Sequence, residues 1–161
     1  MSRAVRLLAP AKVNLTLEVV GKRADGYHEL RSVFGTIDLA DRVRVAAAKR
    51  LDVQVRPDPL DRAMPRETEL TARAVEAFAA ATGRPGHAYV RVTKRIPVAA
   101  GLGGGSSDAG TTLRGLARIW RIEGDIGVVA ASLGSDVPFF AAGASFALIG
   151  GRGERVRELP P

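Results

Sequence analysis

The sequence predicts an α+β fold with a mixed or antiparallel sheet. Alternating apolar and polar residues dominate the first third of the chain, while apolar residues at helical spacing dominate the second half. Strands that mostly precede helices are typical of the α+β class. With 161 residues, of which 46% are hydrophobic, the chain suits one soluble domain with a real core.

Short alternating segments indicate the early strands, which we expect at residues 5–8, 14–20, 30–37, 42–46 and 51–56. Between the first two, Ala-Pro-Ala-Lys-Val-Asn places Lys12 and Asn14 near a strand start. We expect a loop at 21–27, a turn at 38–41 and a proline-bearing loop at 57–65.

Apolar residues at helical spacing predict a helix over 67–81, which Gly83 ends as a C-cap. A strand over 87–93 follows. The later elements are expected as helices at 107–119 and 126–133, a loop at 135–140, a strand at 144–149 and a turn at 150–153. In the helix over 107–119, the apolar ridge is formed by Leu113, Leu116 and, just beyond the helix, Trp120.

The glycine-rich stretch at 94–112 organises the chain. Gly101, Gly103, Gly104 and Gly105 let the backbone adopt left-handed angles and approach a ligand closely. The following serines are good N-caps for the next helix, whose start would attract an anion such as phosphate. A plain glycine-rich turn is the alternative, but it needs fewer glycines.

The common glycine motifs do not fit this stretch. A Walker loop requires a lysine after the last glycine, and a dinucleotide fingerprint requires glycine at Ser106. A hydrolase elbow centred on Ser107 requires glycine at Ala109. The sequence therefore predicts a phosphate loop of another kind.

Composition narrows the class of protein. The chain has no cysteine, which excludes disulfides and thiolate metal sites and fits a reducing cytoplasm. It shows neither a signal-peptide core nor an apolar run long enough to span a bilayer. The net charge of +7 suits polyanions, but the basic residues are dispersed and aromatics are 5%, so nucleic acid is not expected as a partner.

Several polar residues could carry chemistry, each with a plainer alternative. Lys12 could stabilise developing negative charge, or lie on the surface with its stem packed. Asp136 could be a positioned base or a turn residue. Tyr27 and His28 could bind a ring, or form a half-buried strand entrance.

Four ordered motifs resemble the 4-diphosphocytidyl-2-C-methyl-D-erythritol kinases of the GHMP kinase superfamily. They lie at 10–15, at 23–30, at 94–97 with 101–109, and at 133–140. The resemblance implies a two-layer GHMP kinase N-terminal domain of the ribosomal-protein-S5 domain 2-like type over residues 1–161. It also implies that the C-terminal GHMP domain is absent from the chain.

The implied activity is ATP-dependent phosphorylation of the 2-hydroxyl of 4-diphosphocytidyl-2-C-methyl-D-erythritol, in non-mevalonate isoprenoid precursor synthesis. Asp136 is expected to accept the hydroxyl proton, and Lys12 to hold Asp136 as a carboxylate and offset charge. Asn14, Tyr27 and His28 are expected to bind the cytidine diphosphate end. The residues expected at ATP are Lys94, Pro97, Val98, Ala99, Ala100, Gly101, Leu102, Gly103, Gly104, Gly105, Ser106 and Ser107.

The resemblance also implies Mg²⁺ with the ATP, Ser106 or Ser107 being a candidate ligand. Because the family has a second domain, the face it leaves bare could mediate self-association. Two other functions stay open at this point: an inactive nucleotide-binding fragment and, third in rank, an RNA-binding S5-like module.

Overall fold

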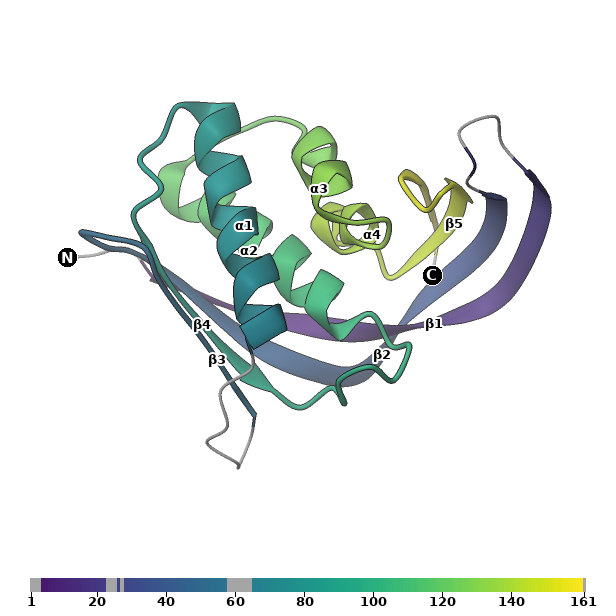
Figure 1. Ribbon diagram of the computed structural model, residues 1–161, viewed down its shortest axis with the longest axis horizontal. Helices are drawn as coiled ribbons and strands as arrows, with labels where there is room; N and C mark the ends of the chain where they lie inside the picture. Colours follow the sequence, from purple (N-terminus) through teal and green to yellow (C-terminus); the bar gives the residue numbers. More distant parts are fainter. Residues whose placement is uncertain (1–3, 23–25, 27, 58–64, 161) are drawn as a thin grey trace.

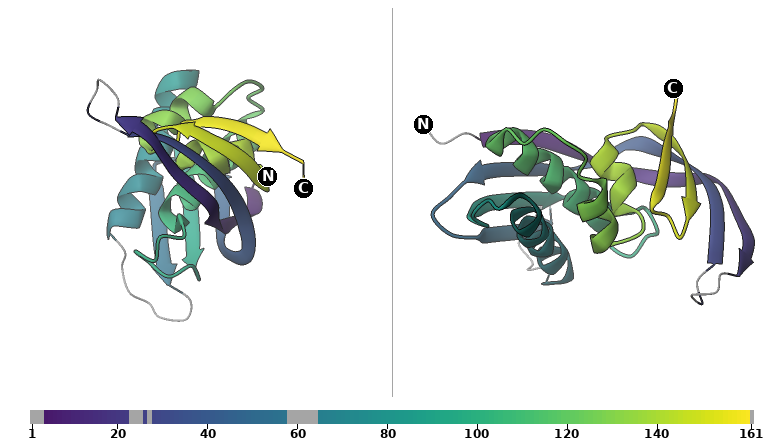
Figure 2. Two further views of the ribbon diagram at one scale, coloured as in Figure 1. Left: turned by 90° about the vertical axis from the view of Figure 1, so that its right-hand side faces the viewer. Right: turned by 90° about the horizontal axis from the view of Figure 1, so that it is seen from above.

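The computed structural model describes residues 4–22, 26, 28–57 and 65–160. Helices cover one face of a curved sheet, leaving the other face open (Figures 1 and 2). The elements follow in the order β1 (Ala4–Lys22), β2 (His28–Ala47), β3 (Asp52–Pro57), α1 (Pro65–Thr82), β4 (Ala88–Lys94), α2 (Gly104–Trp120), α3 (Gly127–Leu133), α4 (Val137–Ala142), β5 (Phe146–Gly151) and β6 (Arg155–Leu159). This two-layer arrangement confirms the predicted α+β class.

The sheet is built around β2, which pairs antiparallel with β1 over nearly its whole length. On its other edge, β2 pairs with β4 through 42–47 and with β5 through 30–35. β3 extends the sheet parallel to β4, and β6 extends it antiparallel to β5. The sheet is therefore mixed. β3 and β4 form one wing, β5 and β6 form the other, and the long hairpin of β1 and β2 joins the two wings.

The long hairpin corrects the predicted early strands. The segments expected at 5–8 and 14–20 form the single strand β1, and those at 30–37 and 42–46 form β2. The expected turn at 38–41 is a register shift, because Pro10 pairs with Ala40 but Ala11 pairs with Ile37. Such a bulge breaks the two-residue period without ending the strand. Lys12 and Asn14 consequently lie in the middle of a strand.

Two later elements, α4 and β6, also differ from the prediction. Residues 137–140, expected in the loop at 135–140, belong to α4, where Pro138 lies at the helix start that tolerates proline. Burial of Phe139 and Phe140 holds this short helix on the sheet. β6 was not predicted, since its alternation contains only two half-buried apolar residues, Val156 and Leu159.

The core lies between the sheet and the helices. On the wing of β3 and β4, valines of the sheet pack against Phe78 of α1 and against Leu113 and Leu116 of α2. This confirms the apolar ridge predicted for α2. A second cluster on the other wing joins Phe34 to Phe139 and Phe140 of α4. The two clusters fix α2 and α4 over the middle of β1 and β2, where the candidate site lies.

Candidate functional site

The glycine loop leads into α2 in the way that a phosphate site requires. Of the four glycines expected to adopt left-handed angles, Gly101 and Gly103 do so, with φ values of 75° and 70°, whereas Gly104 and Gly105 begin α2. Gly103 is the N-cap of α2, and no side chain caps the helix there. The first turn closes with the Ser107 N–H donating to the Gly103 carbonyl at 2.8 Å. The N–H groups before it remain available, at the positive end of the helix dipole, for an anion.

The serines therefore do not cap α2 as expected, because the helix starts earlier, at Gly104. The Ser107 hydroxyl is fully buried and donates to the Pro10 carbonyl at 2.6 Å, which ties α2 to β1. Ser106 is half-buried instead and faces the loop. Of the two, Ser106 is the hydroxyl placed to meet a ligand.

A cavity of about 250 Å³ lies inside this loop. Its lining residues are Leu70, Lys94, Pro97, Val98, Ala99, Ala100, Gly101, Leu102, Gly103, Gly104, Gly105 and Ser106. Apart from Ser107, every residue expected at ATP is among them. Leu70 of α1 is an addition that the sequence did not suggest.

Lys12 is the centre of the second part of the site. Its side chain is buried, and its ammonium donates to the Asn14 amide oxygen at 2.7 Å. The same ammonium lies 3.4 Å from an Asp136 carboxylate oxygen and 4.3 Å from the centre of the Phe34 ring. A cation over a ring is stabilised by the negative face of the ring. The surface alternative for Lys12 is thus excluded.

Asn14 orients Lys12 through a short chain of hydrogen bonds. Its amide nitrogen donates to the Ser32 hydroxyl at 3.1 Å, and that hydroxyl donates to the Thr16 carbonyl. The cross-strand pairing of β1 with β2 places these side chains on one face of the sheet. Ser32 is buried, and no local sequence pattern marks it as part of a site.

Asp136 occupies the N-cap position of α4, yet its carboxylate makes no capping hydrogen bond. With a side-chain exposure of 30%, the carboxylate faces Lys12 while staying open to a ligand. This geometry favours the interpretation of Asp136 as a positioned base over the alternative that it is a turn residue. A carboxylate beside a buried ammonium can accept a proton from a bound hydroxyl.

Close packing joins the two parts of the site. A Cβ placed at Gly103 would lie 3.1 Å from Lys12 Cγ and 3.2 Å from the Phe140 ring, so the loop rests on both. The Lys12 N–H donates to the Leu102 carbonyl at 2.9 Å. A Cβ at Gly110 would lie 2.8 Å from the Ala141 nitrogen, which shows how closely α2 approaches α4. These contacts set where Asp136 stands relative to the loop.

Beneath the loop, Lys94 is held by two buried carboxylates. Its ammonium donates to Asp41 at 2.5 Å and to Asp108 at 2.7 Å. The other Asp41 oxygen accepts from the N–H groups of Arg95 and Ile96, the latter at 2.8 Å. Lys94 therefore lines the cavity, but its charge is engaged in holding β2, α2 and the loop together. Neither aspartate was singled out from the sequence.

Burial dominates the electrostatics of this triad. It raises the pKa of Asp108 to about 8, although the Lys94 ammonium opposes the rise. Burial alone would lower the pKa of Lys94, but Asp108 and Asp41 outweigh it, so the pKa is raised. One Asp108 oxygen has no hydrogen-bond partner within the described residues. The triad thus carries two carboxyl groups for a single ammonium.

The residues expected at the cytidine end are not all brought together. Asn14 lies at Lys12, whereas exposed His28 begins β2 at the far end of the hairpin, paired with Lys22. His28 lies six positions along β2 from Phe34, the partner of Asn14, which is roughly 20 Å in an extended strand. Tyr27 lies outside the described residues.

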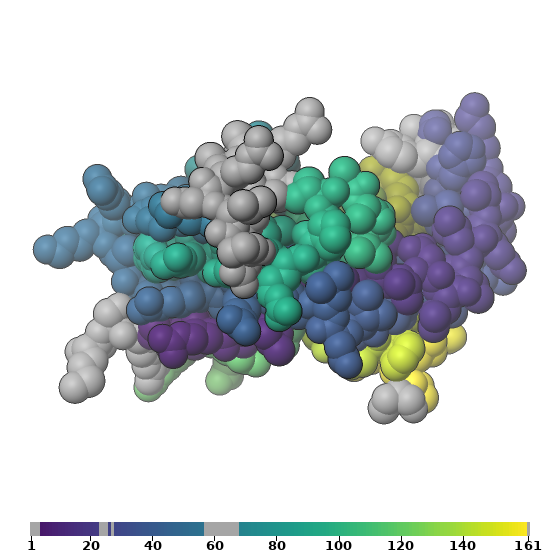
Figure 3. Space-filling view, turned by 90° about the horizontal axis from the view of Figure 1, so that it is seen from below, coloured from purple at the N-terminus to yellow at the C-terminus, as the bar shows by residue number. Residues whose placement is uncertain are grey.

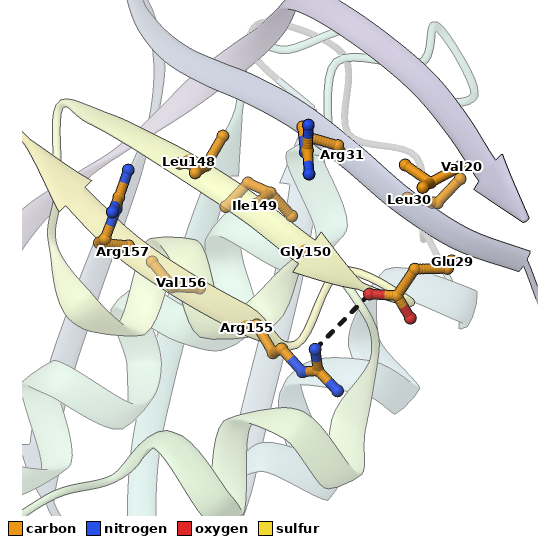
Figure 4. Close-up of a pocket in the computed structure, with 10 residues that line it drawn as sticks. All are labelled: Val20, Glu29, Leu30, Arg31, Leu148, Ile149, Gly150, Arg155, Val156 and Arg157. Carbon is orange, nitrogen blue, oxygen red and sulfur yellow. Dashed lines mark ion pairs between the residues drawn. The ribbon is translucent and has the colours of Figure 1, made fainter.

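A second cavity, of about 540 Å³, opens near that end between the hairpin and β6 (Figure 4). Its lining mixes apolar side chains of β2 and β5 with arginines, and Arg155 lies 3.5 Å from a Glu29 oxygen. Glu29 follows His28 directly.

The described ranges contain neither a metal-binding cluster nor a membrane-spanning helix. No group of three or more His, Cys, Asp or Glu side chains there could hold a metal ion. No helix in that part of the chain is long and apolar enough to cross a membrane.

Sequence comparisons find proteins similar to nearly the whole chain. The profile described as GHMP kinases N terminal domain matches residues 69–144. The 4-diphosphocytidyl-2-C-methyl-D-erythritol kinase of Anaeromyxobacter sp. (strain K) is 48% identical over 96% of this chain and 50% of its own length. The protein of that name from Burkholderia thailandensis is 43% identical over 95% of this chain and 53% of its own. The chain thus spans about half the length of these curated relatives.

Solved structures show the same likeness. The crystal structure of a 4-(cytidine 5'-diphospho)-2C-methyl-D-erythritol kinase matches 96% of this chain and 55% of its own, with 41% identity and a TM-score of 0.76. The mevalonate kinase of Methanococcus jannaschii, at 15% identity and a TM-score of 0.61, shares the fold. The chain therefore carries the N-terminal domain of the GHMP kinases.

Proposed function

We propose that residues 1–161 are the ATP-binding domain of an enzyme that phosphorylates the 2-hydroxyl of 4-diphosphocytidyl-2-C-methyl-D-erythritol. The observation that carries this proposal is the Lys12–Asp136 pair, 3.4 Å apart, beside the uncapped start of α2. Proteins that carry this kinase name are 39–48% identical to the chain. In this proposal a second domain, outside the chain, completes the substrate pocket.

The glycine loop binds the phosphates of ATP. The free N–H groups at the start of α2 and the backbone of the loop line one cavity, so they can donate to several phosphate oxygens together. The Asp41–Lys94–Asp108 triad holds the base of this cavity rigid. Phosphoryl transfer depends mainly on alignment and electrostatic stabilisation, which a rigid loop provides.

Asp136 accepts the proton of the 2-hydroxyl as that oxygen attacks the γ-phosphorus. The bond to the β-phosphate oxygen breaks and ADP leaves. Lys12 stands 3.4 Å from Asp136 and contacts Gly103 of the loop, so its ammonium can offset the negative charge of the transferred group. Asn14 and Phe34 keep the ammonium in that position.

Magnesium fits this site as a companion of the nucleotide. Within the described residues, no carboxylate cluster would hold the ion alone. The phosphates would supply most of its ligands, with the Ser106 hydroxyl as the nearby protein oxygen. Bound there, the ion neutralises phosphate charge.

The cytidine end of the substrate extends along the hairpin towards His28. An extended nucleoside diphosphate ester suits the long spacing between Asn14 and His28. Tyr27 and His28 would recognise the base by stacking and hydrogen bonding.

Acceptor competition tests the proposal in the complete protein that carries this chain. With ATP present, 4-diphosphocytidyl-2-C-methyl-D-erythritol should be phosphorylated at least 100-fold faster than mevalonate or homoserine. Those two are the acceptors named for structures that share only the fold. Preference for either one would contradict the proposal.

A second candidate function is nucleotide binding without turnover by this stretch alone. Residues of this chain line the cavity inside the glycine loop, and the chain spans about half the length of its curated relatives. Titration of the 161-residue chain with ATP, followed by a turnover assay, separates the two. Binding without phosphate transfer supports the binding function for the chain alone.

A further inference from the structure

The open face of the sheet, opposite the helices and the kinase site, carries a block of arginines. Arg42 and Arg44 of β2 are exposed and alternate with Val43 and Val45, which are buried under the helices. The same alternation exposes Arg6 of β1 and Arg91 of β4. All four guanidinium groups therefore belong to the face without helices, onto which Figure 3 looks.

The strand register places these arginines side by side. Arg6 is directly opposite Arg44, and Arg44 is directly opposite Arg91, so three arginines form one row across three strands. Arg42 follows in the next row of the same face, between Leu8 and Thr93. Strands lie about 4.8 Å apart, so the outer arginines of the row start only roughly 10 Å apart.

Such a row is unfavourable unless something neutralises it. Like charges directly opposite each other destabilise a strand pair. Within the described residues none of the four forms an ion pair, and Arg44 has only a ring neighbour, Tyr89, at 5.9 Å. Arg155 of the other wing differs, because it has the carboxylate of Glu29 as a partner (Figure 4).

The block also surrounds a hollow. A cavity of about 420 Å³ is lined by the four arginines together with Leu7, Leu8, Val43 and Thr93. Leu8 is 64% exposed there, and it gives the hollow an apolar patch beside its cationic groups. Arginine groups bind phosphate oxygens in pairs of parallel hydrogen bonds, so this lining suits adjacent phosphates.

We propose that this hollow, the arginine block, binds a compact soluble polyphosphate, with two or three linked phosphates held by Arg6, Arg42, Arg44 and Arg91. A single small anion fits better than a nucleic-acid strand, because the charge is confined to one block. Farther along β1, the exposed side chains of Leu15, Leu17 and Val19 are apolar and do not continue the row of cations.

Inorganic tripolyphosphate is the probe, titrated calorimetrically into the 161-residue chain at 0.15 M salt. Since the glycine loop also attracts phosphate, wild-type protein should bind two equivalents. The double change Arg44→Gln with Arg91→Gln should remove one equivalent, or weaken it at least tenfold, and leave the other. Changing Arg73 and Arg84 to Gln, on the helix side, removes the same charge and should alter both affinities less than twofold.

The melting temperature provides an independent readout. Without ligand, the Arg44→Gln, Arg91→Gln variant should melt higher than wild type, because the repulsion in the row is gone. Tripolyphosphate should raise the melting temperature of that variant less than that of wild type. Equal tripolyphosphate binding by wild type and variant would overturn the proposal. So would arginine-dependent binding of single-stranded RNA by a chain that ignores tripolyphosphate at this face.

Discussion

The closeness of α2 and α4 gives a sharp prediction for Gly110→Ala. The new methyl group would lie 2.8 Å from both the Ala141 nitrogen and Phe140 Cβ, whereas ordinary contact begins at 3.4 Å. Since backbone atoms cannot rotate aside, α4 must move by about 0.6 Å, the difference between these distances. If it moves directly away from β1, the Lys12–Asp136 separation grows from 3.4 Å to about 4 Å.

Two energies set the size of the effect. Overpacking costs about 1–3 kcal/mol, and the better helix propensity of alanine returns up to about 1 kcal/mol. Urea denaturation should therefore show a free energy of unfolding lowered by roughly 1–2 kcal/mol. Because a displacement of about 1 Å in an active site can cost about 100-fold, kcat of the complete enzyme should fall by about 10- to 100-fold.

Gly86→Ala is the matched control. Its nearest neighbour would be the Ala79 Cβ at 3.5 Å, an ordinary contact, and it lies outside the site. This variant should keep the wild-type stability to within about 0.5 kcal/mol and the wild-type rate. A Gly110→Ala protein as stable and as active as wild type would refute the packing argument.

Three further predictions concern the Asp41–Lys94–Asp108 triad and the exposed strand β1. Burial raises the pKa of Asp108 to about 8 from an ordinary 3.8, so its contribution to stability is full below about pH 4 and is lost as pH rises through 8. Asp108→Asn should flatten this fall in pH-dependent denaturation, and an unchanged slope would count against the raised pKa. Asp41→Asn should lower the free energy of unfolding by about 3 kcal/mol, because Lys94 loses a partner; a loss below about 0.5 kcal/mol in urea denaturation would argue against that role. Leu17, 60% exposed on β1, should promote self-association, so Leu17→Glu should reduce any dimer in sedimentation velocity, whereas an unaffected dimer would exclude this face.

Elements whose apolar residues keep an uninterrupted helical or strand spacing were predictable from the sequence. The helix expected at 107–119 is present as Gly104–Trp120, because its apolar ridge follows the 3.6-residue repeat into the core. The early strands were split because the bulge at Pro10 and Ala11 interrupts the alternation, although pairing with β2 continues past it. Local pattern cannot show that a partner strand bridges such an interruption.

The site shows the same division between local and long-range information. The glycine loop has a local signature, and the resemblance pointed to Lys12 and Asp136. Asp41, however, acts on Lys94 from 53 residues away, and nothing around it in the sequence marks it as buried. Its role depends on the pairing of β2 with β4, which the sequence pattern did not reveal.

The most direct test of the account is the effect of Asp136→Asn on phosphate transfer in the complete protein that carries this chain. Phosphorus NMR would follow transfer from ATP to 4-diphosphocytidyl-2-C-methyl-D-erythritol, and calorimetry would follow ATP binding. The account predicts that turnover falls by about 1,000-fold or more while ATP affinity stays within about twofold, because the amide keeps the shape but cannot accept the proton. Turnover within about tenfold of wild type would contradict the assignment of Asp136 as the base.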